Sequence, residues 1–417
     1  MWEDSNKSKW IKIILAAVSL LLVAGLVIAV LSFKKREENQ DAELMQVYAQ
    51  QQAEQQQARQ ASLNEVLDAY EQDMNTVAEY MPGIVCWGDE LTGGTTGGVS
   101  YPAELQQLIN TKLCDLYDFR STVKNADDFN SRIEWEDYVL EIPVVNMGTG
   151  EENVDTVLGR SGAVPYVVAK SFEIPGECEA VPILFKSENG ASVAPLKKAD
   201  GGINDVIIAG VEGKLSIAAG SAYNAPRYVF TRNEAGSPVT VDEGEKILTA
   251  ASEMYLDYIP VVFVGSFGGY ASPSELVQKV QAFLDRQTQQ NRYIVIGTYY
   301  VTYNGYGYRP GAAEMTALES AMSQAFGEHY INLRKYLAND AMADADLNPT
   351  KADTSKMSSG IVPPSLLSSE NGVELTPVAY KLLGNVVYER MVQLGYFDEI
   401  VDELEIKDFG RVEDAKK

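Results

Sequence analysis

The sequence predicts an α/β fold, in which a parallel sheet with flanking helices follows a transmembrane helix and a helical stalk. Three observations support this prediction. Short apolar runs alternate with helical patterns in much of the chain, as they do where crossover helices connect parallel strands. A stretch of 21 residues without charge lies near the N-terminus. Closely spaced turn signals in the middle of the chain indicate an inserted antiparallel β subdomain.

The composition excludes several classes of partner. Hydrophobic residues make up 46% of the 417 residues, which is enough for one large core or two smaller ones. Beyond residue 36 the chain has 28 basic and 57 acidic residues, a net charge of about −29. Nucleic acids and anionic lipid surfaces are bound through clustered Lys and Arg. We therefore expect no nucleic-acid partner.

Residues 13–33 form the uncharged apolar stretch, after an N-terminal tail of residues 1–12. The stretch is long enough to cross about 30 Å of hydrocarbon. A cleaved signal peptide usually has a shorter apolar region of about 7–15 residues and a small-residue cleavage site, whereas three basic residues follow here directly. Three lysines precede the stretch, so the positive-inside rule gives no orientation. We expect a single-pass membrane protein with a retained signal-anchor helix.

Residues 34–80 predict a helical stalk or spacer, because they are rich in Gln, Ala and Glu and contain no Gly or Pro. Apolar residues recur near its end at alternating steps of four and three. They are Leu63, Leu67, Tyr70, Met74, Val77 and Met81. Such a seam is typical of a coiled coil or of a helix docked on a domain. With fewer than three good heptads, both an oligomerising stalk and a monomeric spacer remain open.

Five apolar runs predict the strands of an α/β domain formed by residues 81–165 and 250–397. The runs are residues 84–87, 144–147, 261–264, 293–296 and 330–333. Helix signals separate them. Ser272 begins a capping box with Pro273 at the first helical position. Thr376 opens the last long helix, and Gly395 is its predicted stop.

The segment between the two parts of this domain has a different pattern. Residues 166–249 contain short alternating segments broken by turn signals, which predict the inserted antiparallel β subdomain. The turn signals are Asn189-Gly190, Asp200-Gly201-Gly202, Glu212-Gly213 and Gly236-Ser237-Pro238. Residues 398–417 form an acidic C-terminal tail.

The three cysteines, Cys86, Cys114 and Cys178, do not have metal-ligand spacing. We expect these cysteines to be small buried hydrophobic residues, above all Cys86 in a predicted strand. A disulfide between two of the three is the alternative that remains open.

Four short blocks carry a resemblance to a known family. Residues 83–94 read Gly-Ile-Val-Cys-Trp-Gly-Asp-Glu-Leu-Thr-Gly-Gly, residues 146–151 Asn-Met-Gly-Thr-Gly-Glu, residues 264–270 Val-Gly-Ser-Phe-Gly-Gly-Tyr, and residues 371–376 Asn-Gly-Val-Glu-Leu-Thr. From about residue 81 to residue 397 the chain resembles the SGNH (GDSL) hydrolases, in particular the surface-attached SGNH hydrolase-like proteins of Gram-positive bacteria. The resemblance implies a flavodoxin-type parallel sheet and a globular domain outside the cell.

The resemblance also implies which residues occupy the catalytic positions. The family carries a serine nucleophile, an asparagine oxyanion donor, and an aspartate and a histidine that complete the triad. The corresponding residues here are Glu90, Phe267, Asn371 and Glu374. Gly148 or Gly150 could still supply the backbone N–H of an oxyanion hole. The chain is therefore similar to a pseudoenzyme member of the family, with no catalytic residues.

The single histidine gives an independent argument. A hydroxyl is a poor nucleophile at neutral pH and needs a neighbouring base, usually histidine. The only histidine is His329, just before a predicted strand and far along the chain from the first and last blocks, where a connecting role is expected. An acyl esterase or deacetylase acting on envelope polysaccharide is the alternative function, and the four replacements argue against it.

Glu90 and Glu374 should lie close together, because the serine and histidine that they replace are in hydrogen-bond contact in the family. Two carboxylates at contact distance favour a shared proton or a bound cation. A Ca²⁺ site, a sugar-binding pocket and a solvated remnant of a lost active site all remain open. A glycosidase pair needs about 5–9.5 Å between its carboxyl groups, which these positions do not indicate. The candidate ligand-binding residues are Asp89, Glu90, Gly150, Glu151, Phe267, Tyr299, Tyr303 and Glu374.

Five tyrosines lie between residues 297 and 310, after a predicted strand and so on the ligand side of the sheet. Tyr299 and Tyr303 belong to this group, which can form a stacking platform for a glycan, an adaptable protein interface or an ordinary covering loop. We expect a non-catalytic domain that binds a cell-envelope glycan or a protein partner. A structural role, in which the stalk clusters subunits, is the other alternative.

Overall fold

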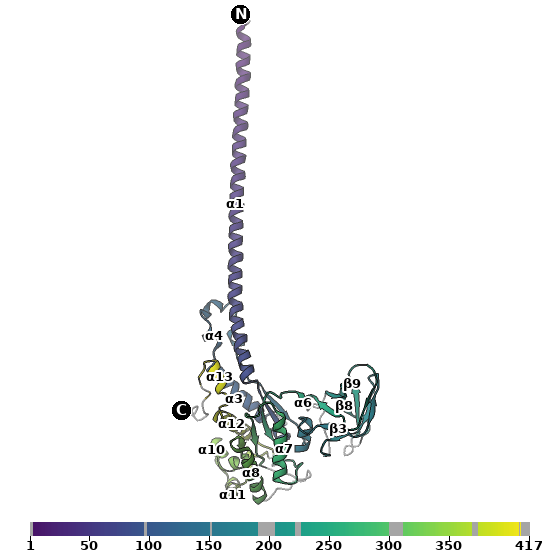
Figure 1. The fold of residues 1–417 in the computed structure, drawn as a ribbon. Coiled ribbons are helices and arrows are strands. Elements are labelled where there is room, and N and C mark those ends of the chain that lie inside the picture. Colours follow the sequence, from purple (N-terminus) through teal and green to yellow (C-terminus); the bar gives the residue numbers. More distant parts are fainter. Residues whose placement is uncertain are drawn as a thin grey trace. The chain divides into compact units, whose positions relative to one another are not determined.

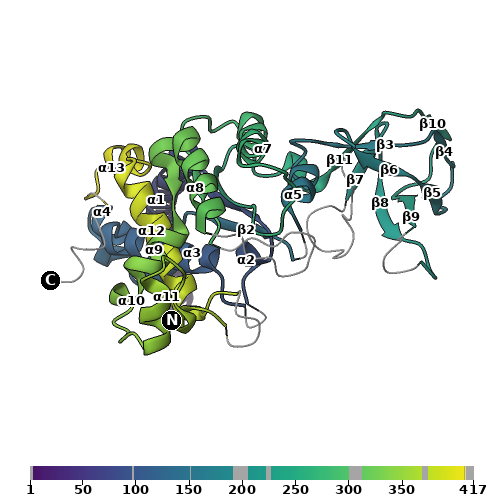
Figure 2. The same ribbon diagram turned by 90° about the horizontal axis from the view of Figure 1, so that it is seen from below.

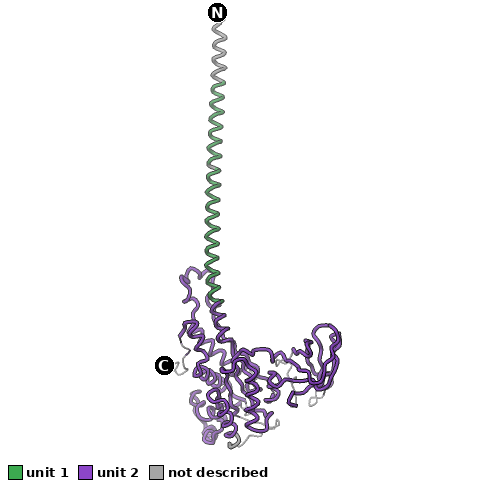
Figure 3. Tube along the Cα trace, viewed as in Figure 1, with its two compact units in different colours: residues 1–71 green, residues 72–417 purple. Residues whose placement is uncertain are grey.

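The computed structural model of the chain describes residues 3–95, 98–150, 152–190, 205–221, 227–299, 312–368, 374–407 and 409. The chain divides into two compact units, residues 1–71 and residues 72–417 (Figure 3). Helix α1 (Glu3–Tyr80) forms the first unit and continues into the second. The sheets and the other helices belong to the second unit (Figure 1).

Helix α1 carries the predicted membrane segment. Its apolar part reaches a mean hydropathy of 2.4 over 18 residues, and none of that window is buried. Large side chains such as Leu20, Leu21 and Leu26 are about two-thirds or more exposed, at 70%, 72% and 67%. A continuous row of exposed leucines and valines is unfavourable in water and favourable in hydrocarbon. By length and composition this helix could therefore span a membrane.

The last turns of α1 are docked in the second unit. Val77 and Met81 are 3% and 0% exposed, whereas Met74 is 48% exposed. The carbonyl oxygen of Tyr80 accepts a hydrogen bond of 2.7 Å from the Arg292 guanidinium. Of the two roles that the apolar seam allowed, docking on a domain is the correct one for Val77 and Met81. Oligomerisation through the preceding residues remains a prediction.

A five-stranded parallel sheet forms the centre of the second unit. Its strands are β1 (Ile84–Gly88), β2 (Val144–Gly148), β12 (Ile259–Phe263), β13 (Ile294–Ile296) and β14 (Tyr330–Ile331). Their order is β14-β13-β12-β1-β2, and every pair is parallel. Numbered along the chain this is the doubly wound order 2-1-3-4-5. The prediction of five parallel strands at these positions is confirmed.

Helices cover both faces of this sheet. Val85 and Trp87 belong to a core shared with α5 (Val154–Arg160), α7 (Pro273–Arg286) and α8 (Ala312–Phe326). Figure 2 shows these three helices on one side of β2. Residues on the opposite face of the strands meet α3 (Tyr101–Leu116), which packs along α12 (Pro377–Gln393). There the ring of Tyr101 meets that of Phe263 edge-on at 6.3 Å.

The predicted helix boundaries are confirmed by the caps. The Ser272 hydroxyl accepts a hydrogen bond from the Glu275 N–H at 3.2 Å, and Pro273 is the first residue of α7. The Thr376 hydroxyl caps α12 through the Ala379 N–H at 3.3 Å. Such caps contribute about 1 kcal/mol each. Gly395 follows α12 with a φ of 70°, a conformation that favours glycine.

A seven-stranded antiparallel sheet lies between β2 and β12 in the chain order. Its order is β5-β9-β8-β7-β11-β3-β6. The strands are β3 (Tyr166–Val168), β5 (Val181–Ile183), β6 (Phe185–Ser187), β7 (Val206–Ile208), β8 (Val211–Ile217), β9 (Tyr228–Arg232) and β11 (Lys246–Thr249), with β4 (Phe172–Ile174) and β10 (Val239–Val241) as a separate pair. The two outermost strands, β5 and β6, are separated in the chain only by Leu184. This sheet has its own core, which includes Ile208 and Phe230.

Packing continues past residue 397, where the sequence analysis ended the α/β domain. Helix α13 (Asp398–Glu403) buries Ile400, and the Phe409 ring stacks on Phe397 at 4.4 Å. The first part of the acidic segment, residues 398–417, therefore packs against the second unit. The remaining helices are α2 (Glu90–Gly93), α4 (Phe119–Thr122), α6 (Ala250–Glu253), α9 (Leu333–Asn339), α10 (Ala341–Asp344) and α11 (Lys351–Met357).

The three cysteines are unpaired, so the structure contains no disulfide among them. Cys86 is fully buried in β1, as expected, and burial raises the pKa of its thiol. The same expectation was wrong for Cys114 and Cys178, whose side chains are exposed. Cys114 follows the buried Leu113 in α3 and so lies off the buried face, which Leu105, Ile109 and Leu113 form at steps of four residues.

Candidate functional site

The candidate site lies at the carboxyl ends of β1 and β12. After β1 the chain turns toward α3 on one face of the sheet, and after β12 it turns toward α7 on the other face. Such a reversal leaves a crevice outside the strand ends, where open α/β sheets bind ligands. The first and third sequence blocks, residues 83–94 and 264–270, both end here. The strand order therefore indicates the same edge of the sheet as the sequence blocks do.

Asp89 is the most buried carboxyl group at this edge, with 1% of the residue exposed. Its Oδ1 accepts a hydrogen bond of 2.9 Å from the Leu91 N–H and caps α2. Its Oδ2 has no hydrogen-bond partner among the described residues. Burial raises the pKa of Asp89 well above its ordinary value, the Leu91 N–H opposes that shift, and Glu90 and Glu152 add to it. Burial thus disfavours the charged form of the Asp89 carboxyl group.

Two buried tyrosines share the neighbourhood of the carboxylates. Tyr299 follows β13 and is 8% exposed, and Tyr380 lies in α12 and is 0% exposed. Burial is the main cause that raises the pKa of both hydroxyls, and the negative charges of Asp89, Glu90 and Glu374 raise both further. The Tyr380 hydroxyl has no hydrogen-bond partner in the described part of the chain. Three carboxylates thus act on the same two hydroxyls.

The backbone around Glu374 is fixed by a short antiparallel bridge. Leu367 and Leu375 form the bridge, and the Ser368 N–H donates a hydrogen bond of 2.7 Å to the Glu374 carbonyl. Helix α12 begins three residues later and carries Tyr380 in its first turn. Glu90 is the first residue of α2 and is exposed, while Glu374 is half-buried. Both carboxylates act electrostatically on the Tyr299 and Tyr380 hydroxyls, and a direct contact between the two carboxylates remains a prediction.

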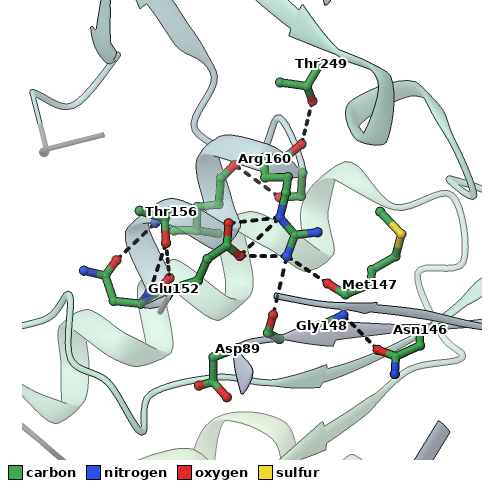
Figure 4. Close-up of polar contacts among 12 residues, drawn as sticks. Asp89, Asn146, Met147, Gly148, Glu152, Thr156, Arg160 and Thr249 are labelled. Atoms are coloured by element: carbon green, nitrogen blue, oxygen red, sulfur yellow. Dashed lines mark hydrogen bonds and ion pairs between the residues drawn. The ribbon is translucent and has the colours of Figure 1, made fainter. Parts of the chain in front are cut away.

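Arg160 holds the strand ends beneath the site (Figure 4). Its side chain is fully buried and pairs with Glu152 at 2.7 Å. Nη2 also donates to the carbonyl oxygens of Met147 at 2.8 Å and Gly88 at 3.4 Å, which end β2 and β1. The guanidinium lies over the Trp87 ring at 5.0 Å. Burial raises the pKa of Glu152, and Arg160 opposes this shift.

In the second block, the Gly148 N–H is less available as an oxyanion donor than the sequence predicted. The Gly148 N–H donates a hydrogen bond of 2.9 Å to the Asn146 side chain, so Asn146 already engages it (Figure 4). A Cβ on Gly148 would lie 2.1 Å from the Gly93 nitrogen, so this close approach requires glycine. Gly150 is buried in the turn after β2 and is the remaining sequence-predicted donor.

The third block is fixed by hydroxyl contacts. Ser266 is fully buried, and its hydroxyl lies 2.5 Å from that of Thr298, which links the loops after β12 and β13. The Tyr270 hydroxyl donates to the Gly265 carbonyl at 2.9 Å. Phe267 is half-buried between these residues. Its side chain cannot donate a hydrogen bond, so it offers an apolar surface where the SGNH hydrolases, which the sequence blocks resemble, have an amide.

His329 lies at the opposite edge of the sheet. It immediately precedes β14, and its ring stacks on Tyr293, which precedes β13, at 4.2 Å. Its Nδ1 is 2.8 Å from the Tyr396 hydroxyl and 3.1 Å from the Tyr293 carbonyl oxygen. Both strands begin at this edge, whereas Asp89 and Glu90 follow the end of β1. The prediction that His329 is a connecting residue is confirmed.

Some predicted site residues lie outside the described residues, namely Glu151, Tyr303 and Asn371. Within the described ranges, no group of three or more His, Cys, Asp or Glu side chains is arranged to hold a metal ion. Calcium binding by Glu90 and Glu374 therefore remains a prediction. Sequence reasoning missed Arg160 and Tyr380. Tyr380 fell on the apolar stripe of its helix, and an arginine at a helix end gives no signal of burial.

Comparisons with protein-family models, curated proteins and solved structures gave no match. The assignment of the site therefore rests on the sequence blocks, the strand order and the side-chain geometry.

Proposed function

We propose that the chain is a single-pass membrane protein whose SGNH hydrolase-like domain, with an inserted antiparallel β subdomain, lies outside the cell. In this proposal the domain binds a cell-envelope glycan and has no serine-esterase activity. One observation carries the proposal. At the edge where the sheet order reverses, the exposed Glu90 and the buried Asp89 follow the end of β1, and the half-buried Phe267 follows β12.

The position of the only histidine away from this edge supports a non-catalytic role. Serine hydrolysis needs a hydroxyl in contact with a general base. Ser266 is fully buried and engaged with Thr298. His329 is the only histidine of the chain and lies beside the amino ends of β13 and β14. Glu90 occupies the position that the family gives to serine.

The chemistry of the site suits a polyhydroxylated ligand. Sugars are bound by a few convergent polar groups together with apolar or aromatic surface. Carboxylates accept hydrogen bonds from sugar hydroxyls, and tyrosine hydroxyls can donate or accept them. Phe267 adds apolar surface at the same edge. A protein partner that presents similar groups is the alternative ligand, and it has no observation of its own in its favour.

Cosedimentation with envelope polysaccharide tests the proposal. Full-length protein in detergent would be mixed with insoluble envelope polysaccharide and centrifuged, alongside the variants Glu90→Gln and Glu374→Gln. Glu243, which is exposed in the turn between β10 and β11, provides a matched control, Glu243→Gln. We expect parent and control to sediment with the polysaccharide. Each site variant should bind about tenfold more weakly, because a hydrogen bond to a charged group contributes about 1.5–3 kcal/mol. Equal sedimentation of all four proteins would contradict the proposal.

A further inference from the structure

The parallel sheet ends in an edge strand whose outer side is open. Strand β2 is the last strand of the order β14-β13-β12-β1-β2, and of the described strands it pairs with β1. Pro143 accepts a hydrogen bond of 2.9 Å from β1, and Thr149 donates one of 3.2 Å to β1. Along a strand, every second residue turns its N–H and carbonyl groups to the same side. The N–H and carbonyl groups of Val144 and Asn146 therefore point away from β1.

Asparagine side chains close the two ends of this edge and leave its middle open. Before the strand, Asn110 Oδ1 accepts a hydrogen bond of 2.9 Å from the Ile142 N–H. At its end, Asn146 Oδ1 accepts one of 2.9 Å from the Gly148 N–H (Figure 4). Between them, the outward backbone groups of Val144 and Asn146 have no hydrogen-bond partner among the described residues. A row of such groups can pair with another strand.

A cavity lies beside the open edge. It has a volume of about 650 Å³ and is lined by one face of α3, including Ala103, Gln107, Asn110 and Asp115. Asn110 also binds the Ile142 N–H, which places the cavity next to the edge. Clefts that bind ligands have volumes of about 300–1,000 Å³. In strand addition the edge binds a peptide backbone, and pockets beside the edge receive alternate side chains.

The spacing of the open groups favours an extended peptide as the occupant. The outward groups recur at every second residue, about 6.7 Å apart, and the backbone of another strand has the same repeat. A second copy of β2 fits less well, because α3 packs on β2 itself. Two copies joined through β2 would place these strands about 4.8 Å apart, whereas packed helices need about 8–10 Å between their axes.

The charges beside the edge indicate the character of the peptide. Asn146 Nδ2 lies 3.3 Å from the Ser100 hydroxyl at the start of α3, whereas Asn110 binds before the strand, so α3 runs antiparallel to β2. The last turn of α3, with the exposed Asp115, therefore lies toward the start of β2, where Glu141 is also exposed. None of the described lining residues is a cation. A basic side chain is attracted to this end of the groove.

We propose that β2 and α3 bind an extended, basic peptide segment of a partner protein, which adds a strand to the parallel sheet. The backbone of the segment pairs with Val144 and Asn146. Its alternate side chains contact the amides of α3, and a Lys or Arg lies beside Asp115 and Glu141. The proposal does not depend on the glycan-binding function.

A random peptide library provides the probe. Full-length protein in detergent would select binders from linear peptides of about nine residues displayed on phage, and the selected peptides would be synthesised and titrated by calorimetry. We expect Lys or Arg to be enriched at one end of the selected peptides. Methylation of one alternate set of backbone nitrogens should abolish binding, because it removes the donors that face β2, while methylation of the other set should not. A library that gives no binder would overturn the proposal.

Variants of the groove locate the binding. Ala103 is exposed, so Ala103→Trp fills part of the groove, and Ala325→Trp makes the same change at an exposed position of α8. We expect Ala103→Trp to bind the selected peptides at least about tenfold more weakly and Ala325→Trp to bind them as the parent does. The double variant Asp115→Lys, Glu141→Lys should bind them about threefold more weakly, since exposed ion pairs contribute little. The melting temperature of each variant establishes that it is folded.

Amide hydrogen exchange tests the pairing itself. The amides of Val144 and Asn146 should become protected when a selected peptide binds the parent, and should not change when it is added to Ala103→Trp. Protection elsewhere, or equal binding by the parent and Ala103→Trp, would overturn the proposal. A dimer of the full-length chain that Ala103→Trp dissociates would identify a second copy as the occupant. Loss of sedimentation with envelope polysaccharide in Ala103→Trp would identify a glycan, and either result would overturn the peptide proposal.

Discussion

At the scale of single residues, Asp89 combines a structural and a destabilising role. Its Oδ1 caps α2, while its Oδ2 is buried without a partner among the described residues. The sequence placed Asp89 correctly after the first strand but treated it only as additional charge. Its pKa depends on burial, and burial depends on how α2, α12 and the strand ends meet in three dimensions. No pattern in residues 83–94 reports that arrangement.

The raised pKa of Asp89 gives a pH prediction. The folded state binds the Asp89 proton more tightly than the unfolded state, so this group adds stability at pH values below its ordinary pKa of 3.8. That stability is lost as the pH rises through the raised folded pKa. Asp89→Asn keeps a good N-cap and removes the charge. We expect the variant to melt above the parent at pH 7 and the two to converge on acidification, measured by calorimetry from about pH 8 to pH 4. A variant that melts below the parent at pH 7 would contradict the buried, unpartnered Oδ2.

The buried pair of Arg160 and Glu152 gives a second prediction at this scale. Arg160→Met leaves the Glu152 carboxylate buried without its cation, and such a break costs about 3–5 kcal/mol. The double variant Arg160→Met, Glu152→Leu removes both charges and should recover most of that loss. Chemical denaturation of the parent, both single variants and the double variant measures the coupling. Additive losses would show that the two side chains do not act as a pair.

At the scale of elements, short sequence patterns correctly predicted the features that neighbouring residues determine, such as the caps and ends of helices. Ser272 and Thr376 cap helices where the sequence placed caps, and Gly395 follows the end of α12. The antiparallel sheet was predicted only as a class of structure. Its strands β5 and β6 are three residues long and are joined by Leu184, and so short a run carries too few residues for alternation to reveal its pairing.

The end of α1 gives a prediction about an element. Met81 is fully buried in the second unit, whereas Met74 of the same apolar seam is about half exposed. Met81→Ala should destabilise that unit by about 2–5 kcal/mol, the usual loss for a buried methionine. Met74→Ala should change its stability by less than about 0.5 kcal/mol. Denaturation of both variants distinguishes them. A similar loss in both, together with a reduced oligomeric mass, would instead make the whole seam a subunit interface.

At the scale of the whole molecule, the charge distribution and the apolar helix act together. Six of the 34 basic residues lie within the first 36 positions, around the apolar stretch, and the remainder of the chain is strongly acidic. An acidic domain attached to a membrane is repelled by anionic lipid and attracts cationic ligands. The sequence alone predicted this separation of basic and acidic residues, because the separation depends on the order of residues along the chain and not on packing.

Membrane attachment is directly testable. The full-length chain should remain with membranes after a carbonate wash, because the uncharged, mainly apolar stretch of 21 residues in α1 favours hydrocarbon. A chain beginning at Glu37 should be soluble under the same conditions. N-terminal sequencing of each fraction provides the control. Recovery of soluble protein with a new N-terminus after residue 33 would identify a cleaved signal peptide.

The central claim is that the carboxylates at the strand ends retain a glycan and do not hydrolyse it. Cosedimentation of full-length protein with insoluble acetylated envelope polysaccharide, with free acetate quantified in the supernatant, tests this claim most directly. We predict that the parent sediments with the polysaccharide, that Glu374→Gln binds it about tenfold more weakly, and that acetate stays at the level of buffer in both. Acetate released by the parent and absent with Glu90→Gln would show carboxylate-dependent hydrolysis and contradict the claim.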